Sequence, residues 1–95
     1  GKTYRNMIAD MKRALPARYD CMASRALGEP QRAMLQYYAG IVTYRDETRP
    51  RRCELLLVQG GAGKPPHPGA HWQKLWEGAR PGDNSERFWL YRRAP

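Results

Sequence analysis

The sequence predicts a small, mainly α-helical domain with a minor β element, an α+β fold. Apolar residues recur at helical spacing through residues 4–15 and 29–47. A continuous apolar run at 53–59 and an aromatic run at 86–92 are typical of strands. We therefore expect three short N-terminal helices, then a strand, an extended Gly/Pro-rich arm and a C-terminal aromatic strand.

The first predicted helix runs from Tyr4 to Leu15, with Thr3 as its N-terminal cap. Its basic, acid-poor fringe is also typical of a presequence or a membrane-surface helix, but its apolar stripe favours a helix docked on a core. Pro16 ends this helix and opens a second one, which Gly28 is expected to close. The residues expected on the buried side of the second helix are Tyr19, Met22, Ala23, Ala26 and Leu27.

The third predicted helix, Glu29 to Glu47, is the best-specified element. Pro30 suits a first turn, and Glu29 places negative charge at the positive end of the helix dipole. Arg49-Pro50 then ends the helix. Its expected buried face is apolar and rich in tyrosine, comprising Met34, Tyr37, Tyr38, Ile41 and Tyr44.

The second half of the chain is predicted to contain two strands, which would be antiparallel if they pair with one another. The segment 60–82 between them is too rich in Gly and Pro for a continuous element. Within it, residues 71–78 have Trp72, Leu75 and Trp76 at helical spacing and are expected to form two helical turns.

We divide the single predicted domain into two parts. Residues 1–59 form a helical core with one strand, and residues 60–95 form an extended basic and aromatic arm. A broken segment of this length is usually functional or ordered by a partner.

Positive charge is the strongest functional signal. Seventeen Lys and Arg residues oppose nine Asp and Glu residues, which gives a formal net charge of +8. This excess favours a polyanionic partner such as RNA, DNA or an anionic membrane surface, although a solvated basic surface is the plain alternative. The residues expected to contact phosphate, without base specificity, are Arg49, Arg51, Arg52, Lys64, Arg92 and Arg93.

Aromatic residues alternate with these cations in the last third of the chain. Arg and Trp together are typical of desolvated contacts with RNA or protein. The alternative is that the three tryptophans fill the small core. The residues expected at a protein interface are Trp72, Trp76, Trp89 and Tyr91.

The two cysteines, Cys21 and Cys53, are too few for a disulfide framework. Both have apolar neighbours, so we expect buried reduced thiols, with a single bridge as the alternative. The longest strongly apolar run is Leu55 to Val58, whereas a transmembrane helix needs about 20 residues.

Motifs for catalysis, cofactors and metals are incomplete. Gly60–Lys64 resembles part of a phosphate-binding loop, but Val58 and Pro65 stand where that loop needs a glycine and a hydroxyl. His67 and His71 have helical spacing, but Pro68 and Gly69 lie between them, so a zinc site is not expected. We predict no enzymatic activity, no cofactor and no metal site.

These observations favour a non-enzymatic structural subunit of a multi-subunit assembly, a small basic protein of an organellar, mitochondrial-type ribosome or related ribonucleoprotein. Its partners would be rRNA or acidic protein subunits, with no small-molecule substrate. The alternative is an accessory subunit of a respiratory complex or ATP synthase at the matrix surface, with peripheral contact to anionic lipid. A third is a small DNA-binding module, in which residues 17–27 and 30–47 imitate a helix-turn-helix. The first two place the chain in mitochondria.

Overall fold

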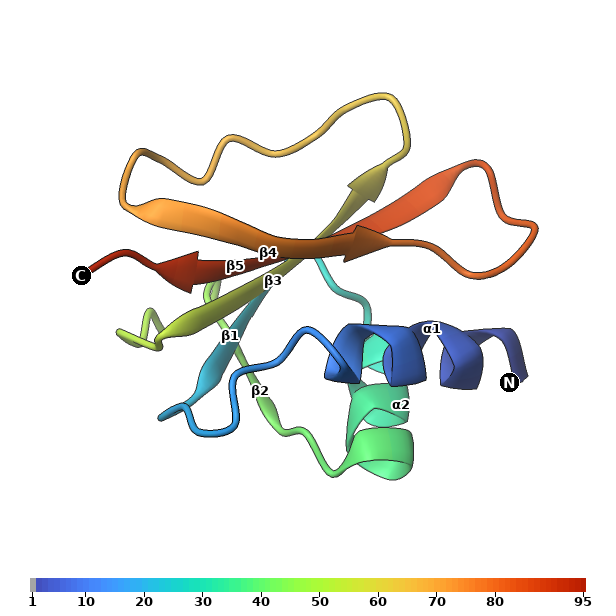
Figure 1. The fold of residues 1–95 in the computed structure, drawn as a ribbon, viewed down its shortest axis with the longest axis horizontal. Coiled ribbons are helices and arrows are strands. Elements are labelled where there is room, and N and C mark those ends of the chain that lie inside the picture. The colour runs from blue at the N-terminus through green and yellow to red at the C-terminus, as the bar shows by residue number, and fades with distance from the viewer. Residues whose placement is uncertain (1) are drawn as a thin grey trace.

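The computed structural model describes residues 2–95, which fold into a five-stranded mixed sheet with two helices. The strands follow the order β2-β1-β3-β5-β4; β1 is parallel to β2 and β3, and β5 is antiparallel to β3 and β4. Among residues 2–95, neither helix has the length and apolarity needed to cross a membrane. The elements (Figure 1) are α1 (Lys2–Lys12), β1 (Met22–Arg25), α2 (Glu29–Ala39), β2 (Thr43–Arg45), β3 (Leu55–Gly61), β4 (Trp72–Gly78) and β5 (Glu86–Arg93).

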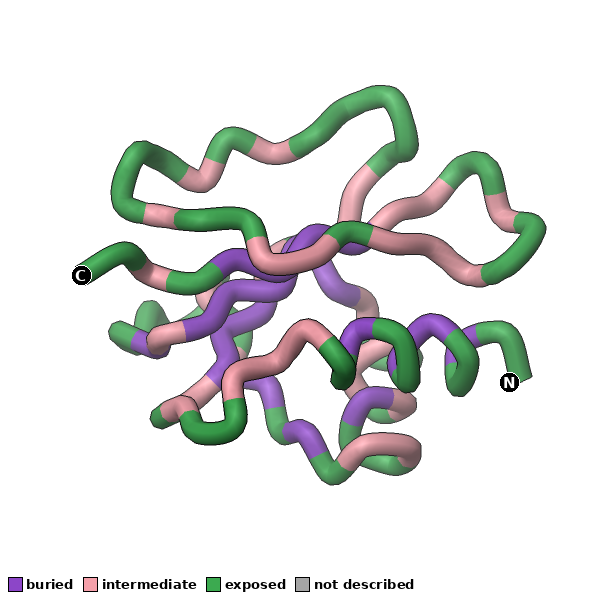
Figure 2. The backbone as a smooth tube through the Cα atoms, in the orientation of Figure 1, coloured by how far each residue is buried: buried purple, intermediate pink, exposed green. Residues whose placement is uncertain are grey.

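Both helices lie on the same side of the sheet, and the main core lies between the two layers (Figure 1). Successive strand residues point to opposite faces, so alternate residues of the central strands meet the helices. The buried segments gather along these strands and the inner sides of the helices (Figure 2). The buried residues of this core are Tyr4, Met7, Ile8, Met11, Met22, Leu27, Leu35, Ile41, Leu55, Leu57, Phe88 and Leu90.

The opposite face of the sheet carries a second apolar cluster. The β3–β4 connection arches over the side of the sheet away from the helices (Figure 1). Gly60 of β3 lies against Trp89 of β5, and a Cβ added at Gly60 would lie 3.3 Å from Trp89 Cζ3. Loops and side chains, rather than a second helical layer, bury Ala23, Cys53, Leu56, Val58, Trp89 and Tyr91.

The prediction of a mainly α-helical chain with three N-terminal helices is wrong. Residues 16–28 do not form a helix, because Met22–Arg25 is β1 and pairs with a strand on each side. Sheet pairing has overridden the helical spacing of the apolar residues here. Gly28 precedes α2 as its N-cap instead of closing a helix.

The third predicted helix is also shorter than expected. It ends at Ala39, because Gly40 adopts a left-handed conformation with φ +66° and its N–H bonds to the Gln36 carbonyl at 2.9 Å. Thr43–Arg45 then forms β2. The expected buried face is shifted too, since Leu35 is the buried residue and Tyr37 is 83% exposed.

The segment expected as an arm contributes two strands to the same sheet. Residues 71–78 are not helical, because Trp72–Gly78 is β4. The expected aromatic strand is β5, which lies between β3 and β4 and pairs antiparallel with β3, as predicted for those two segments. A register shift between Lys74 and Trp76 marks a bulge in β4.

Cys21 and Cys53 form a disulfide, the alternative to the reduced thiols that we expected. The bond links the residue before β1 to the connection that leads into β3. Beside it, the Asp20 carboxylate accepts hydrogen bonds from the backbone N–H groups of Glu54 and Cys21, which lower the pKa of Asp20. Two contacts therefore fix where β1 and β3 begin relative to one another.

The disulfide is expected to be a major source of stability. It joins residues 32 apart in the sequence, and closing a loop of that length in the unfolded chain stabilises the fold by about 3–4 kcal/mol. We expect the Cys21→Ala/Cys53→Ala variant to have a free energy of unfolding that is lower by this amount. Its unfolding midpoint should therefore lie at a lower denaturant concentration. Wild-type protein in reductant is the control and should match the variant; an unchanged midpoint in both would contradict the prediction.

Candidate functional site

The free edge of β2 is covered by an arginine from α2. Arg32 Nη2 donates a hydrogen bond to the Thr43 carbonyl at 2.9 Å, and Arg32 Nε donates to Thr43 Oγ1 at 3.2 Å. The guanidinium thus bonds to a carbonyl of a strand that has a sheet partner on one side only. Arg32 is thereby held in one orientation between the helix and the sheet edge.

The end of β2 and the connection to β3 place three further arginines beside this edge. The Arg49 N–H and the Thr48 hydroxyl both donate to the Arg45 carbonyl at 3.3 Å, which folds the chain into a turn. The Arg51 guanidinium lies over the Tyr44 ring, 3.9 Å from its centroid. The turn and the stacked ring bring Arg45, Arg49 and Arg51 to one surface.

These arginines surround a hollow of about 260 Å³, which we call the basic hollow. Arg45, Arg49 and Arg51 form no ion pair with any residue in the described part of the chain. Their charges are therefore available to a ligand. The residues lining the basic hollow include no carboxylate and are Arg32, Thr43, Tyr44, Arg45, Thr48, Arg49 and Arg51.

A second hollow of about 200 Å³ adjoins the first, between α2 and β2, and we call it the α2 recess. The two hollows share Arg32 and Thr43. The α2 recess differs in chemistry, because its other lining residues are Glu29, Ala33, Gln36 and Val42.

The six residues predicted to contact phosphate are divided by the structure. Arg49 and Arg51 line the basic hollow, and Arg52 and Lys64 are exposed outside it. Arg92 and Arg93 line a separate hollow of about 410 Å³ with Glu54, Gln73 and Pro95.

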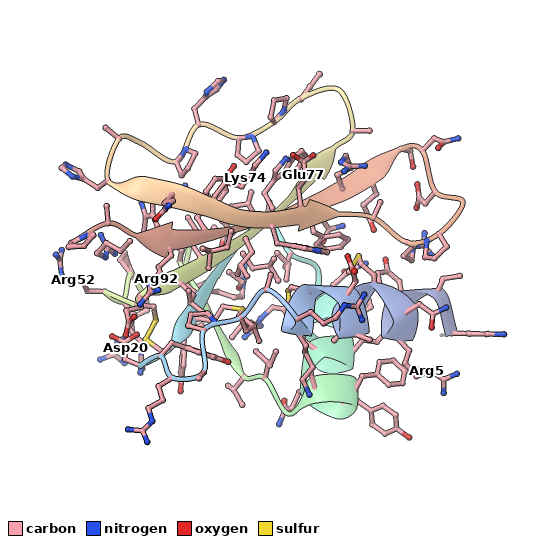
Figure 3. All side chains as sticks on the ribbon, in the orientation of Figure 1. Arg5, Asp20, Arg52, Lys74, Glu77 and Arg92 are labelled. Atoms are coloured by element: carbon pink, nitrogen blue, oxygen red, sulfur yellow. A yellow bond between two sulfur atoms is a disulfide. The ribbon has the colours of Figure 1, made fainter. Side chains whose placement is uncertain are left out.

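Arg92 and Arg93 differ from Arg45 and Arg49 of the basic hollow because their side chains already have partners within the chain. Arg92 pairs with Glu54 at 3.7 Å. Arg93 donates to the Cys53 carbonyl at 3.4 Å and stacks over Trp72 at 4.4 Å. Figure 3 shows Arg92 and Arg52 at one end of the sheet and Arg5 projecting from α1 at the other side of the molecule.

Sequence reasoning did not select Arg32 and Arg45 for phosphate contact. Arg32 stands on the polar side of the helical pattern, and Arg45 lay inside the helix that we predicted through residue 47. Only the formation of β2 brings these two residues beside Arg49 and Arg51. The basic run at residues 49–52 indicated Arg49 and Arg51 from the sequence, but no local pattern indicated Arg32 and Arg45.

The residues predicted at a protein interface have contacts within the chain. Trp89 and Tyr91 are 3% and 6% exposed and belong to the second apolar cluster. Trp72 packs against the same cluster, whereas Trp76 packs against the main core and donates from Nε1 to Asp10 at 2.9 Å. Only Trp72 and Trp76 retain partly exposed surface, so an interface at these two residues stays a prediction.

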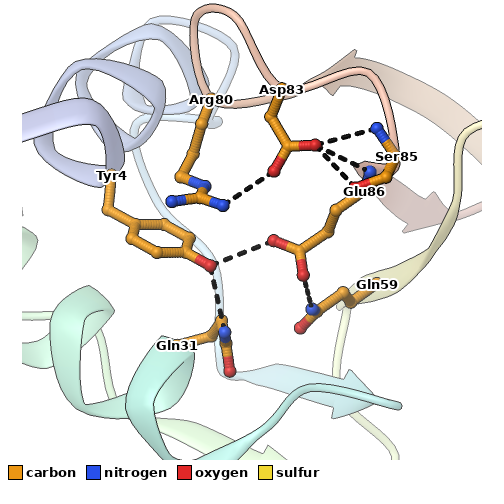
Figure 4. Close-up of polar contacts among 7 residues, drawn as sticks. All are labelled: Tyr4, Gln31, Gln59, Arg80, Asp83, Ser85 and Glu86. Carbon is orange, nitrogen blue, oxygen red and sulfur yellow. Dashed lines mark hydrogen bonds and ion pairs between the residues drawn. The ribbon is translucent and has the colours of Figure 1, made fainter.

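A polar network joins α1, α2 and the sheet (Figure 4). The Tyr4 hydroxyl donates to Glu86 at 3.0 Å and accepts from Gln31 at 3.0 Å, while Glu86 accepts from Gln59 at 2.6 Å. Arg80 stacks over the Tyr4 ring at 4.5 Å. These contacts, together with the apolar residues of α1 in the main core, dock α1 on the sheet.

The turn beside this network is held by Asp83. Its carboxylate accepts hydrogen bonds from the Ser85 N–H at 2.8 Å and the Ser85 hydroxyl at 2.9 Å, and it pairs with Arg80 at 2.7 Å. These bonds hold the pKa of Asp83 well below its usual range. The carboxylate is therefore part of the turn that aligns β4 with β5.

Within residues 2–95, no group of three or more His, Cys, Asp or Glu residues is placed so that it could hold a metal ion. A scan of protein families, a search of curated proteins and a search of solved structures each found no match to this chain. The basic hollow and its surroundings are the part of the structure that indicates a function.

Replacing Tyr4 with Phe should destabilise the fold. The substitution keeps the ring but removes the hydroxyl shared by Gln31 and Glu86, and partly buried groups left without a partner cost about 1–3 kcal/mol. Denaturant unfolding should show a loss in that range. Tyr37→Phe is the matched control, because Tyr37 is 83% exposed; equal effects from the two substitutions would contradict the docking role.

Replacing Asp83 with Asn should destabilise the fold in a pH-dependent way. Because the pKa of Asp83 is lowered by folding, its stabilisation is present above about pH 4 and is lost as the pH falls below that value. Thermal unfolding should therefore show a lower midpoint for Asp83→Asn at neutral pH and a shrinking difference in acid. A difference that stays constant with pH would refute this role of the carboxylate.

Proposed function

We propose that this chain is a non-enzymatic RNA-binding domain that holds phosphate groups in the basic hollow at the β2 edge. The carrying observation is that Arg32, Arg45, Arg49 and Arg51 line one hollow without a carboxylate. Arginine is suited to this task because its planar guanidinium donates two parallel hydrogen bonds to phosphate. The fixed position of Arg32 against Thr43 lowers the entropy lost when a ligand binds.

The overall charge supports the same proposal. Only seven of the 17 basic side chains form an ion pair in residues 2–95. The others contribute to a positive field that attracts a polyanion over a distance of about 10 Å at moderate salt. Binding of this kind is salt-dependent and largely independent of base sequence.

A role as a structural subunit of a ribonucleoprotein, such as an organellar ribosome, is the wider form of this proposal. The Cys21–Cys53 disulfide favours an oxidising compartment, because such bonds persist mainly in oxidising environments. Location in the mitochondrial matrix therefore stays a prediction that needs its own test. The third hypothesis, a helix-turn-helix that binds DNA, is not supported, since residues 17–27 do not form a helix.

Removing three arginines should weaken RNA binding. We expect Arg45→Gln/Arg49→Gln/Arg51→Gln to lower the affinity for a generic single-stranded RNA by about 10- to 100-fold at low salt. The slope of log affinity against log salt should fall by about 2, since each lost phosphate contact removes about 0.7. Fluorescence anisotropy over a salt series measures both quantities.

The matched control is Lys2→Gln/Arg5→Gln/Lys12→Gln, which removes the same charge from exposed positions of α1 that form no ion pair within residues 2–95. This variant should retain most of the affinity. Failure of the wild-type protein to bind at low salt, or equal losses in the two triple variants, would rule out the basic hollow as an RNA site.

A further inference from the structure

The two hollows along β2 differ in charge, although they share a wall. Arg32 and Thr43 line both. Beyond this wall, the basic hollow presents Arg45, Arg49 and Arg51, whereas the α2 recess presents no cation other than Arg32. A ligand that is anionic at one end and uncharged at the other therefore matches the two hollows.

We infer that the chain binds single-stranded RNA with a phosphate in the basic hollow and a neighbouring base, one that carries an exocyclic amino group, in the α2 recess. This inference rests on the proposed function and adds a ligand class and a base preference to it. A nucleotide has the required division, because its charge is confined to the phosphate and its base is an uncharged ring with polar edges.

The lining of the α2 recess suits a base better than a phosphate. The Glu29 side chain is 91% exposed and pairs with Arg32 only at 3.9 Å, so its carboxylate can still repel phosphate and accept hydrogen bonds from amino groups. Gln36 is exposed and offers both a donor and an acceptor. Ala33 and Val42 supply apolar contact for the ring. Val42 is 51% exposed and is one of two exposed large hydrophobic residues within residues 2–95.

A single strand fits this arrangement better than a duplex. In a duplex the bases are stacked and paired inside the helix, so a strand whose phosphate fills the basic hollow turns its bases toward the other strand. In a single strand the base can rotate away from its neighbours and enter the recess. Arg32 is held by Thr43 between the two hollows, so the wall that separates phosphate from base is already formed.

Glu29 gives the base preference. A carboxylate accepts hydrogen bonds but donates none, so it favours the amino group of cytosine over the carbonyl oxygen that uracil carries at the same ring position. Cytosine and uracil have rings of equal size. Oligocytidine and oligouridine are therefore a matched pair of probes that differ in the group facing Glu29.

The test is fluorescence anisotropy of the wild-type protein with oligocytidine, oligouridine and a duplex RNA of equal length. We expect oligocytidine to bind about three- to tenfold tighter than oligouridine, the effect of one or two hydrogen bonds, and tighter than the duplex. Glu29→Ala should bring the ratio between the two oligonucleotides toward one, whereas Gln36→Ala should weaken the binding of both, because an amide can donate to or accept from either base. Glu29→Ala should also bind oligouridine more tightly, because the carboxylate no longer repels the backbone.

Gln73→Ala is the control, since Gln73 is exposed and lines the separate hollow beside Arg92, and its ratio should equal that of the wild type. Equal binding of the three RNAs would overturn the base recess and leave the proposed function standing. A ratio that persists in Glu29→Ala would overturn it as well. No binding to any RNA at low salt would overturn both proposals.

Discussion

The pairing of β1 with a parallel strand on each side determines the arrangement of the whole sheet at this end of the molecule. Met22 lies opposite Thr43 on one side and Leu55 on the other. With only four residues, β1 makes few ladder hydrogen bonds, so its register depends on contacts at its two ends. The disulfide and the Asp20 carboxylate hold its beginning, and the ion pair of Arg25 with Asp46 at 3.0 Å holds its end.

This register also positions the candidate site. Because Thr43 is held opposite Met22, its carbonyl lies within reach of Arg32 on α2. The chain must then leave β2, cross β1 and return to the start of β3, and this path carries Arg49 and Arg51. A slip of one residue in β2 would move each of Thr43 and Tyr44 from its present face of the sheet to the other face. The contacts that hold Arg32 and Arg51 would then be lost.

The elements that the sequence predicted well are those with a strong local pattern. The apolar run at 53–59 and the aromatic run at 86–92 correspond to β3 and β5, and the stripe of the first helix is buried in α1. In contrast, β1 and β2 have four and three residues, and their extended state comes from neighbours distant in sequence. The β4 segment was wrongly predicted to be helical. Its bulge lets the neighbouring residues Leu75 and Trp76 both pack on the main core, so their spacing in the sequence resembles that of a helix.

The candidate site was half predictable for the same reason. The cluster at Arg49 and Arg51 is visible as a basic run, but its meeting with Arg32 and Arg45 exists only once β2 pairs with β1. Charge composition predicts the class of partner, whereas the location of the site is a property of the tertiary structure.

The two edges of the sheet differ in how their cations are paired, and this difference is the reason we propose a binding site at β2. Both sheet faces are covered, so the margins of the sheet are the places left for a ligand. At the β4 edge, Glu77 pairs with Lys74 at 2.5 Å and with Arg87 at 3.1 Å, and the hydrogen bond from Lys74 lowers the pKa of Glu77. At that edge, the two cations share a carboxylate of the same chain. At the β2 edge, Arg45, Arg49 and Arg51 have no carboxylate partner within residues 2–95, so a polyanion gains most by binding there.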